Sequence, residues 1–272
     1  MPTRSAFSAV LLLPIAVSFS LACRTPQNYL DPALPLYEGT FGAQPPSRPE
    51  IRVVTFNVEY ALHVPEAIAA LRSEPELRAP DLLLLQEMDA PGVEAVARAL
   101  RLNYVYCPSS VHPVHKRDIG AAVLSPWPIE ESAKVLLPHT SRFSGHARAA
   151  VAATVLVAGQ RVRVYCLHLG TPINLGKQAR LDQLEAVLAD AAAHDGFVVI
   201  GGDFNSRGMA ERVAKRGFEW ATRDIGRTTA LFSFDHILSR GFGTGRAPQT
   251  GVVRQVKGVS DHSPAWAVLS LE

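Results

Sequence analysis

Cysteine is scarce in this chain of 272 residues, which contains only Cys23, Cys107 and Cys166. So few cysteines exclude a small disulfide-stapled scaffold, and no cysteine–histidine spacing typical of a structural zinc site occurs. Cys107 and Cys166 each lie within an apolar run, so we expect them to be small buried side chains without a bridge between them.

An excess of charge of one sign is also missing. The sequence has 27 basic and 25 acidic side chains, a formal net charge of +2. This balance argues against broad electrostatic binding of nucleic acid, although it leaves local surface patches open. Hydrophobic residues make up 47% of the chain, which is ample for a packed core.

The N-terminus indicates export. Residues 1–22 have a basic start at Arg4 and an apolar run that is too short for a spanning helix, as in a signal peptide. The ending "SLAC" resembles a bacterial lipobox with Cys23 as the lipid acceptor, although Ser20 stands where leucine is usual. We expect an exported lipoprotein anchored to a membrane and facing the periplasm or the exterior; cleavage followed by secretion is the alternative.

Residues 23–50 are rich in proline and show no apolar period, so they predict an extended, poorly ordered tether. From residue 51 to 272 short apolar runs alternate with turns and amphipathic helices, which indicates one domain. The expected strands lie at 51–58, 80–89, 103–107, 119–129, 197–205, 232–238 and 264–271, with a hairpin over 148–170 that turns at Ala158 and Gly159. The expected helices lie at 64–77, 91–102 and 175–193.

Hairpin strands mixed with strand–helix units predict an α+β fold of two mixed β-sheets packed together, with the helices outside. Polar residues follow five of the apolar strands, and a sixth, Asp235, lies within one. They are Asn57, Glu87, His168, Asp203 with Asn205, and Asp261 with His262.

Any one of these residues has a simple structural explanation, because Asp and Asn commonly cap turns. Six similar placements are different, since buried carboxylates are costly unless a cation or hydrogen bonds compensate them. A hard divalent ion is the natural partner, so we expect Mg²⁺, with Mn²⁺ or Ca²⁺ as alternatives. Gly201 and Gly202 precede the Asp203 group, and we expect them to allow the backbone and a substrate to approach closely.

Six short motifs carry a family resemblance. "TFNV", "LLLLQE", "HLG", "IGGDFN", "FDHI" and "VSDHSP" occur in the order seen in the endonuclease/exonuclease/phosphatase superfamily, which the chain resembles over residues 51–271. The resemblance implies a four-layer helix–sheet–sheet–helix sandwich and a metal-dependent hydrolase of phosphoester bonds.

The resemblance also implies roles for individual residues. Glu87 would be the principal metal ligand, with Asn57 beside it and Asp261 as a second carboxylate on the metal side. Asp203 would orient or deprotonate the attacking water, and Asn205 would donate a hydrogen bond to a phosphate oxygen.

His262, oriented by Asp235, would face the reacting phosphate. His168 matches the histidine found in pancreatic deoxyribonuclease and the sphingomyelinases. Asp118 would orient His168, and Arg148 would bind a phosphate; for these two a turn acid and an edge-strand arginine remain equally open. The pair Arg180 and Gln183 on the third helix, which many relatives carry after the "HL" element, is either part of this pattern or solvent-facing.

We expect an exported phosphodiesterase whose substrate is a nucleic acid or a phospholipid head group, with DNA slightly ahead of lipid. A lipid anchor would bring it to a membrane; nothing in the sequence implies a protein partner, and a monomer is expected. The alternative of another class is a non-catalytic lipoprotein that uses the fold as a binding scaffold.

Overall fold

The computed structural model describes residues 26–243, 248–254, 256 and 258–272. The predicted signal peptide and Cys23 lie outside these residues. Within them, no helix is long and apolar enough to cross a membrane.

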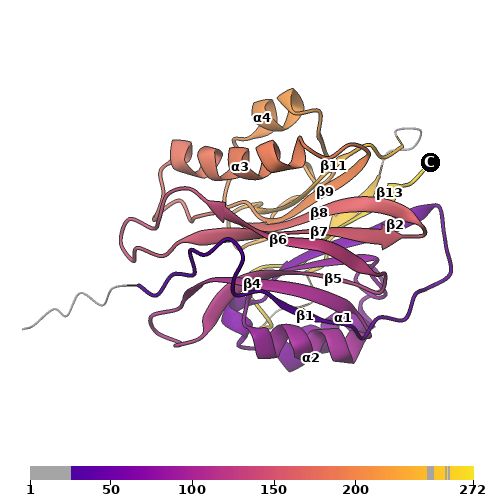
Figure 1. The fold of residues 1–272 in the computed structure, drawn as a ribbon, viewed down its shortest axis with the longest axis horizontal. Helices are drawn as coiled ribbons and strands as arrows, with labels where there is room; N and C mark the ends of the chain where they lie inside the picture. The colour runs from indigo at the N-terminus through magenta and orange to yellow at the C-terminus, as the bar shows by residue number, and fades with distance from the viewer. Residues whose placement is uncertain (1–25, 244–247, 255, 257) are drawn as a thin grey trace, which may run out of the picture.

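Two mixed β-sheets pack face to face at the centre of the molecule (Figure 1). The first contains, in spatial order, β1 (Tyr37–Gly39), β4 (Asn103–Val111), β5 (Asp118–Ser125), β3 (Leu82–Met88), β2 (Glu50–Asn57), β13 (Ala265–Ser270) and β12 (Gln249–Val252). The second contains β10 (Glu219–Trp220), β11 (Asp235–Arg240), β9 (Phe197–Asp203), β8 (Gln160–His168), β7 (Arg148–Val157) and β6 (Ile129–Leu137). In the described residues the parallel pairs are β2 with β3 and β8 with β9, and the other pairs are antiparallel.

Helices form the two outer layers. α1 (Val64–Ser73) and α2 (Ala90–Leu100) cover the first sheet, while α3 (Lys177–Ala191) and α4 (Ala210–Lys215) cover the second (Figure 1). The short 3₁₀ helix η1 (Glu59–Ala61) follows β2. Asp89 caps α2 by accepting a hydrogen bond from the Gly92 amide at 2.8 Å, with Pro91 in the first turn. The predicted helix–sheet–sheet–helix sandwich is confirmed.

The sandwich explains the uninterrupted apolar runs of the central strands. In β3, Leu82 and Leu84 pack between the two sheets, whereas Leu83 and Leu85 pack under α1 and α2. A strand covered on both faces needs apolar residues at every position, so alternation disappears from its sequence. Polar residues can then appear in such a strand only where their hydrogen bonds are satisfied.

Gln86 is a buried polar residue of this kind, and it connects the two sheets. Its Nε2 lies 3.1 Å from Thr55 Oγ1 on β2 and 3.1 Å from Cys166 Sγ on β8. Cys166 and Cys107 are both buried and unbridged, as predicted, and burial raises the pKa of each thiol to about 12. The link across the sheets lies one residue before Glu87 and two before His168.

The two glycines of β9 lie at close approaches of the backbone, as expected, and these approaches are to neighbouring protein atoms. A Cβ added at Gly202, where φ is +145°, would lie 1.9 Å from the Leu167 carbonyl oxygen of the neighbouring strand. One added at Gly201 would lie 2.4 Å from Leu84 Cδ1 of the facing sheet. The glycines therefore allow the close packing of strands and sheets.

The N-terminal segment from residue 26 to 50 also differs from the predicted tether, because it packs along the domain. β1 pairs with β4, and Lys134 Nζ donates to the carbonyls of Tyr29, Asp31 and Leu34 at 2.7 to 3.3 Å. Lys134 is only 5% exposed. Backbone pairing and a buried ammonium group hold the segment in place despite its many prolines.

Candidate active site

The sequence-predicted polar residues converge at one end of the sandwich. Asn57 and Glu87 come from the first sheet, while His168, Asp203 and Asp235 come from the second. His262 reaches the group from the loop before β13. Because β9 and β11 are antiparallel and pair Asp203 with Asp235, the end of one strand faces the start of the next. Asp235 is the first residue of β11 rather than an interior strand residue, which places it at this end.

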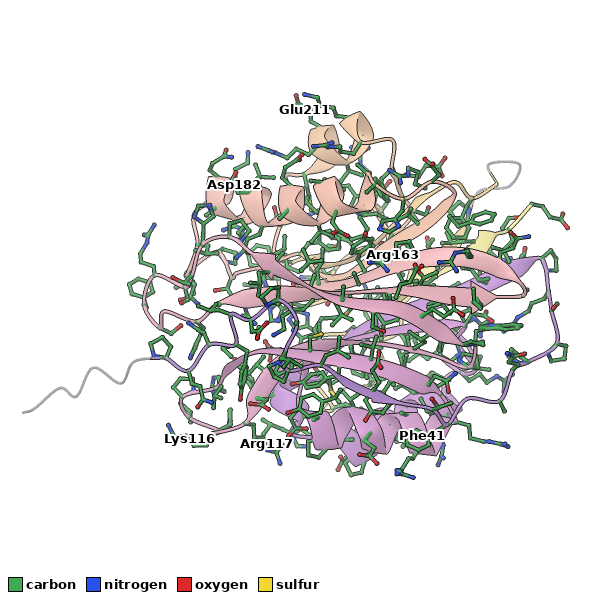
Figure 2. The ribbon with its side chains drawn as sticks, in the orientation of Figure 1. Phe41, Lys116, Arg117, Arg163, Asp182 and Glu211 are labelled. Atoms are coloured by element: carbon green, nitrogen blue, oxygen red, sulfur yellow. The ribbon has the colours of Figure 1, made fainter. Side chains whose placement is uncertain are left out.

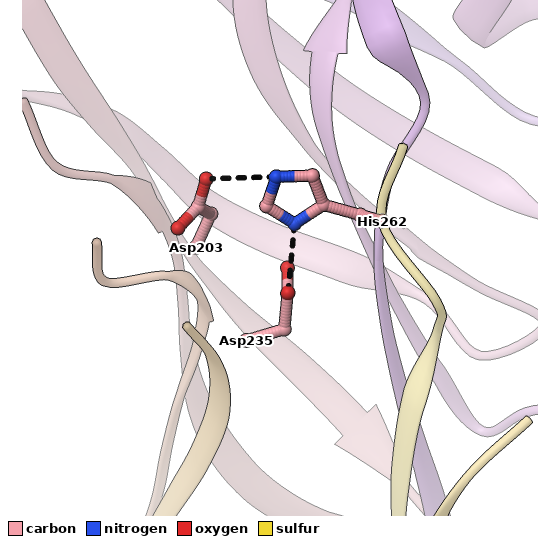
Figure 3. A group of neighbouring side chains, drawn as sticks. All are labelled: Asp203, Asp235 and His262. Carbon is pink, nitrogen blue, oxygen red and sulfur yellow. Dashed lines mark hydrogen bonds and ion pairs between the residues drawn. The ribbon is translucent and has the colours of Figure 1, made fainter. Parts of the chain in front are cut away.

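Asp203, Asp235 and His262 form a compact cluster (Figure 3). His262 Nδ1 lies 2.8 Å from Asp235 Oδ2, and His262 Nε2 lies 3.8 Å from Asp203 Oδ2. Burial, the largest influence, lowers the pKa of His262, but the charge and hydrogen bond of Asp235 together with Asp203 outweigh it and raise this pKa to about 10. The imidazole is therefore held as a cation between two carboxylates.

Asp203 is buried and surrounded by amide donors. Its Oδ1 accepts from the Asn205 backbone amide at 2.9 Å, and its Oδ2 accepts from Asn205 Nδ2 at 3.1 Å and from Asn57 Nδ2 at 3.3 Å. Burial raises the pKa of Asp203, while the charge of His262 acts in the opposite direction.

Asn205 Nδ2 also donates to the Leu169 carbonyl at 3.1 Å. Both amide hydrogens thus have acceptors within the protein, and Asn205 positions Asp203 instead of presenting a free donor to a phosphate as expected.

His168 is oriented by Arg148 and not by Asp118, so that part of our prediction is wrong. Arg148 Nη1 lies 3.1 Å from His168 Nδ1, whereas Asp118 Oδ1 accepts a hydrogen bond from the Tyr29 hydroxyl at 2.8 Å. The segment taken for a tether supplies Tyr29 and so occupies Asp118. Arg148, predicted as a phosphate ligand, does lie within the site.

The Arg148 contact fixes the protonation of His168. A guanidinium can only donate, so Nδ1 must accept and Nε2 must carry the proton. Burial, with the positive charges of Arg148 and His262, lowers the pKa of His168 well below its usual value. Its Nε2 lies 3.4 Å from Asp203 Oδ2 and 3.9 Å from Glu87 Oε1. His168 is therefore a neutral donor aimed at the centre of the site.

Glu87 occupies a β-bulge in β3, where the pairing with β5 shifts between Gln86 and Met88. Its φ of +56° lies in the left-handed region, which is unusual for a glutamate in a strand. Strain of this kind commonly marks a functional position, because the bulge redirects one side chain. The bulge directs Gln86 into the core and Glu87 toward the site.

The surroundings of Glu87 fit a hard cation. Its carboxylate is 12% exposed and accepts a hydrogen bond from the Tyr60 amide at 3.2 Å. Burial raises its pKa, Arg148 and His262 lower it, and the exposed Asp261 in the loop before β13 raises it again. Glu87, with the negative charge of Asp261 acting on it, offers carboxylate oxygens of the kind that a divalent ion would neutralise.

The Asp203–Asp235–His262 cluster is the other group of potential ligand atoms, which all lie within 4.8 Å of one another. Here the His262 imidazolium faces both carboxylates, and Asp203 also accepts three hydrogen bonds from Asn57 and Asn205. Among the described residues only Asp235 Oδ1 of this cluster has no hydrogen-bond partner. We therefore assign the cation to the Glu87 side and a hydrogen-bonding role to this cluster.

Several residues that support the site were not identified from the sequence. Thr228 Oγ1 accepts from the Asp235 amide at 3.2 Å, and Ser260 Oγ donates to the Asn57 carbonyl at 2.7 Å while accepting from the His262 amide at 3.0 Å. Gln183 is buried and not solvent-facing: its Oε1 accepts from the Gly170 amide and its Nε2 donates to the Pro138 carbonyl. Ser260 lies within the "VSDHSP" motif, which was the one available signal; Thr228 had none.

Comparison with known proteins bears on this geometry. A sequence model of the Endonuclease/Exonuclease/phosphatase family matches residues 54–262, a span that contains every catalytic and metal residue proposed above. The chain belongs to this family. Its members are hydrolases that act on phosphoester bonds. No curated protein sequence matches the chain significantly.

Solved structures share the fold at low sequence identity. An endonuclease/exonuclease/phosphatase from Beutenbergia cavernae is 21% identical, with a TM-score of 0.64 over 82% of this chain and 72% of its own. D. rerio TDP2 complexed with a single-strand DNA product is 20% identical, with a TM-score of 0.63 over 81% and 99%. The human nocturnin catalytic domain is 18% identical, with a TM-score of 0.61 over 87% and 97%. At these identities the likeness shows the fold alone.

Proposed function

We propose that this protein is a divalent-metal-dependent hydrolase of phosphodiester bonds. The observation that carries the proposal is the meeting of Glu87 from the first sheet with the Asp203–Asp235–His262 cluster and neutral His168 at one end of the sandwich. A non-catalytic scaffold has no need for four largely buried ionisable groups whose pKa values are displaced in opposite directions.

Glu87, with Asp261 beside it, would hold the metal ion, for which Mg²⁺ is our first choice. A bound divalent ion would neutralise phosphate charge and polarise the bond to phosphorus. Asp203 lies between both histidines and would orient the attacking water and accept its proton. His262, charged by its contact with Asp235, would stabilise the developing negative charge, and His168 Nε2–H would donate to a phosphate oxygen.

Both substrate classes predicted from the sequence, a nucleic acid and a phospholipid head group, have support. D. rerio TDP2 holds a DNA product, which supports a nucleic-acid substrate by analogy of fold. The loops around this site support the other class, a phospholipid head group, for reasons given in the next section. We further propose export and a lipid anchor at Cys23, which mass spectrometry of the membrane fraction from cells making the wild-type and Cys23→Ser chains would test.

The decisive experiment removes the metal and its principal ligand. With bis-p-nitrophenyl phosphate, plasmid DNA, RNA and sphingomyelin as substrates, chelation should abolish hydrolysis and Mg²⁺ should restore it. Glu87→Gln should lower the rate by at least about 100-fold. Glu211→Gln is the matched control, since Glu211 lies on α4, on the outer face of the second sheet (Figure 2). Full activity in excess chelator would refute the proposal.

A further inference from the structure

Three loops beside the active site carry exposed apolar side chains. They are the β4–β5 loop (112–117), the β6–β7 loop (138–147) and the β8–α3 loop (169–176), which we call the rim. Val114, Phe143 and Ile173 are 75%, 73% and 78% exposed, the three largest values among the exposed large hydrophobic residues described. One such residue at the surface is ordinary, but one on each of three adjacent loops indicates a contact surface.

Hydrogen bonds join the loops into one surface. The Arg142 amide donates to the Asn174 carbonyl at 3.1 Å, and Ser141 Oγ donates to Asn174 Oδ1 at 2.8 Å. Gln183 binds both Gly170 and Pro138. The Val111 amide, at the start of the first loop, donates to the Gln27 carbonyl, and Asn28 Nδ2 donates to the Gly145 carbonyl. The N-terminal segment thus connects the first loop to the second.

The rim encloses an extension of the active site. A cavity of about 160 Å³ is lined by Glu87 and Arg148 at its inner end and by Ser141, Ser144, Thr171 and Asn174 from the rim. Its size suits one small polar group. Hydroxyl and amide side chains are suited to the polar part of a head group attached to the reacting phosphate.

The charge of the rim, and the place where the N-terminal segment enters the fold, favour a membrane as the partner. The three loops contain no acidic residue, but they contain Lys116, Arg117 and Arg142. Arg117 lies 3.6 Å from Asp89, so the unbalanced positive charge comes from Lys116 and Arg142. Figure 2 shows Lys116 and Arg117 at the end of the molecule where the described chain begins.

Pro26, the first described residue, packs against Gly145 in the β6–β7 loop. The chain therefore enters the fold at the rim (Figure 1). Only two residues lie between Cys23 and Pro26, a reach of about 10 Å, so a lipid on Cys23 would meet the bilayer close to the rim.

We propose that the rim docks on the surface of an anionic phospholipid bilayer, with Val114, Phe143 and Ile173 entering the head-group region and Lys116 and Arg142 facing acidic lipids. Basic side chains near an anionic surface and apolar side chains within the interface act together in such binding. Of the three exposed apolar side chains only Phe143 has a ring on which a base could stack, whereas Val114 and Ile173 are aliphatic, which favours lipid over nucleic acid. That the docked substrate is a head-group phosphodiester rests on the proposed function.

Fluorescence of the full-length protein tests the docking. Phe143→Trp is compared with Glu211→Trp, a control on α4, after mixing with vesicles of phosphatidylcholine and phosphatidylglycerol that contain brominated lipid. The signal that Phe143→Trp adds to the wild-type emission should shift to shorter wavelength and be quenched, whereas the signal that Glu211→Trp adds should not change. Equal behaviour of the two variants, or a response of Phe143→Trp to short DNA and not to vesicles, would overturn the proposal.

Activity provides a second, separable readout. The triple variant Val114→Ser, Phe143→Ser, Ile173→Ser should lose roughly tenfold or more in hydrolysis of head-group-labelled vesicles, because burial of apolar side chains is lost. Its hydrolysis of bis-p-nitrophenyl phosphate should be unchanged, since none of the three contacts the reacting groups. If brominated lipid quenches Phe143→Trp but no substrate is hydrolysed, docking of the rim is supported and the proposed phosphodiesterase activity is refuted. If the vesicles are hydrolysed without quenching, the activity is supported and docking of the rim is refuted.

Discussion

At the scale of single residues, the two histidines of the site are held in opposite states. His262 is charged because Asp235 lies against its Nδ1, and His168 is neutral because Arg148 lies against its Nδ1. The same ring atom thus receives a carboxylate in one case and a guanidinium in the other. One imidazole supplies positive charge and the other a neutral N–H donor, so they are not interchangeable.

A mutant cycle tests how His262 and Asp235 depend on each other. His262→Ala should lower kcat by roughly 10²–10⁴, and Asp235→Asn should lower it by about 10² through loss of the oriented cation. Because Asp235 acts through His262, the double variant should be no slower than His262→Ala alone. Multiplicative losses in steady-state rates would show that Asp235 has an independent role.

At the scale of secondary-structure elements, β9 is the strand on which the site depends most. It carries Asp203 at its end, lies between β8 and β11, and approaches β8 so closely that Gly202 has no room for a side chain. The site geometry therefore depends on backbone packing as well as on the polar residues.

Gly202→Ala should destabilise the fold by about 2–5 kcal/mol, because it combines an unfavourable φ with a clash against Leu167. Gly176→Ala, at the start of α3 with nothing within 4 Å of the added Cβ, should cost under about 1 kcal/mol. Urea denaturation measures both. Similar midpoints for the two variants would show that β8 and β9 can separate without cost.

The elements also show what the sequence could and could not predict. The strand-end pattern located Asn57, Glu87, His168 and Asp203 because buried strands are long apolar runs that end abruptly. His262 lies in the loop before β13 and was identified through the "VSDHSP" motif instead. α4 has six residues, too few for a helical period, and β6 is a half-buried edge strand without a clear alternation. The role of Asp118 failed for a different reason: its partner Tyr29 is 89 residues away in a segment whose composition resembles a linker.

At the scale of the whole molecule, the N-terminal segment is part of the folded domain. It supplies β1, the three carbonyl acceptors of Lys134 and the Asn28 side chain that binds the β6–β7 loop. Composition alone did not reveal this, since prolines prevent regular structure without preventing specific docking.

A truncated chain that starts at residue 47 should therefore be less stable than one that starts at residue 26, by at least about 2 kcal/mol, because it leaves Lys134 without its acceptors and exposes the edge of β4. Both chains keep Arg48 and its ion pair with Asp81. Urea denaturation compares them, and identical midpoints would restore the original interpretation of a tether.

The Gln86 link between the sheets has a consequence for folding. Each sheet supplies only half of the site, and the link lies next to Glu87 on one side and close to His168 on the other. Neither half can have partial activity, and the halves align only after the central core has closed. Turnover therefore reports on complete assembly: during refolding, hydrolysis should return with the slowest structural signal and never ahead of it.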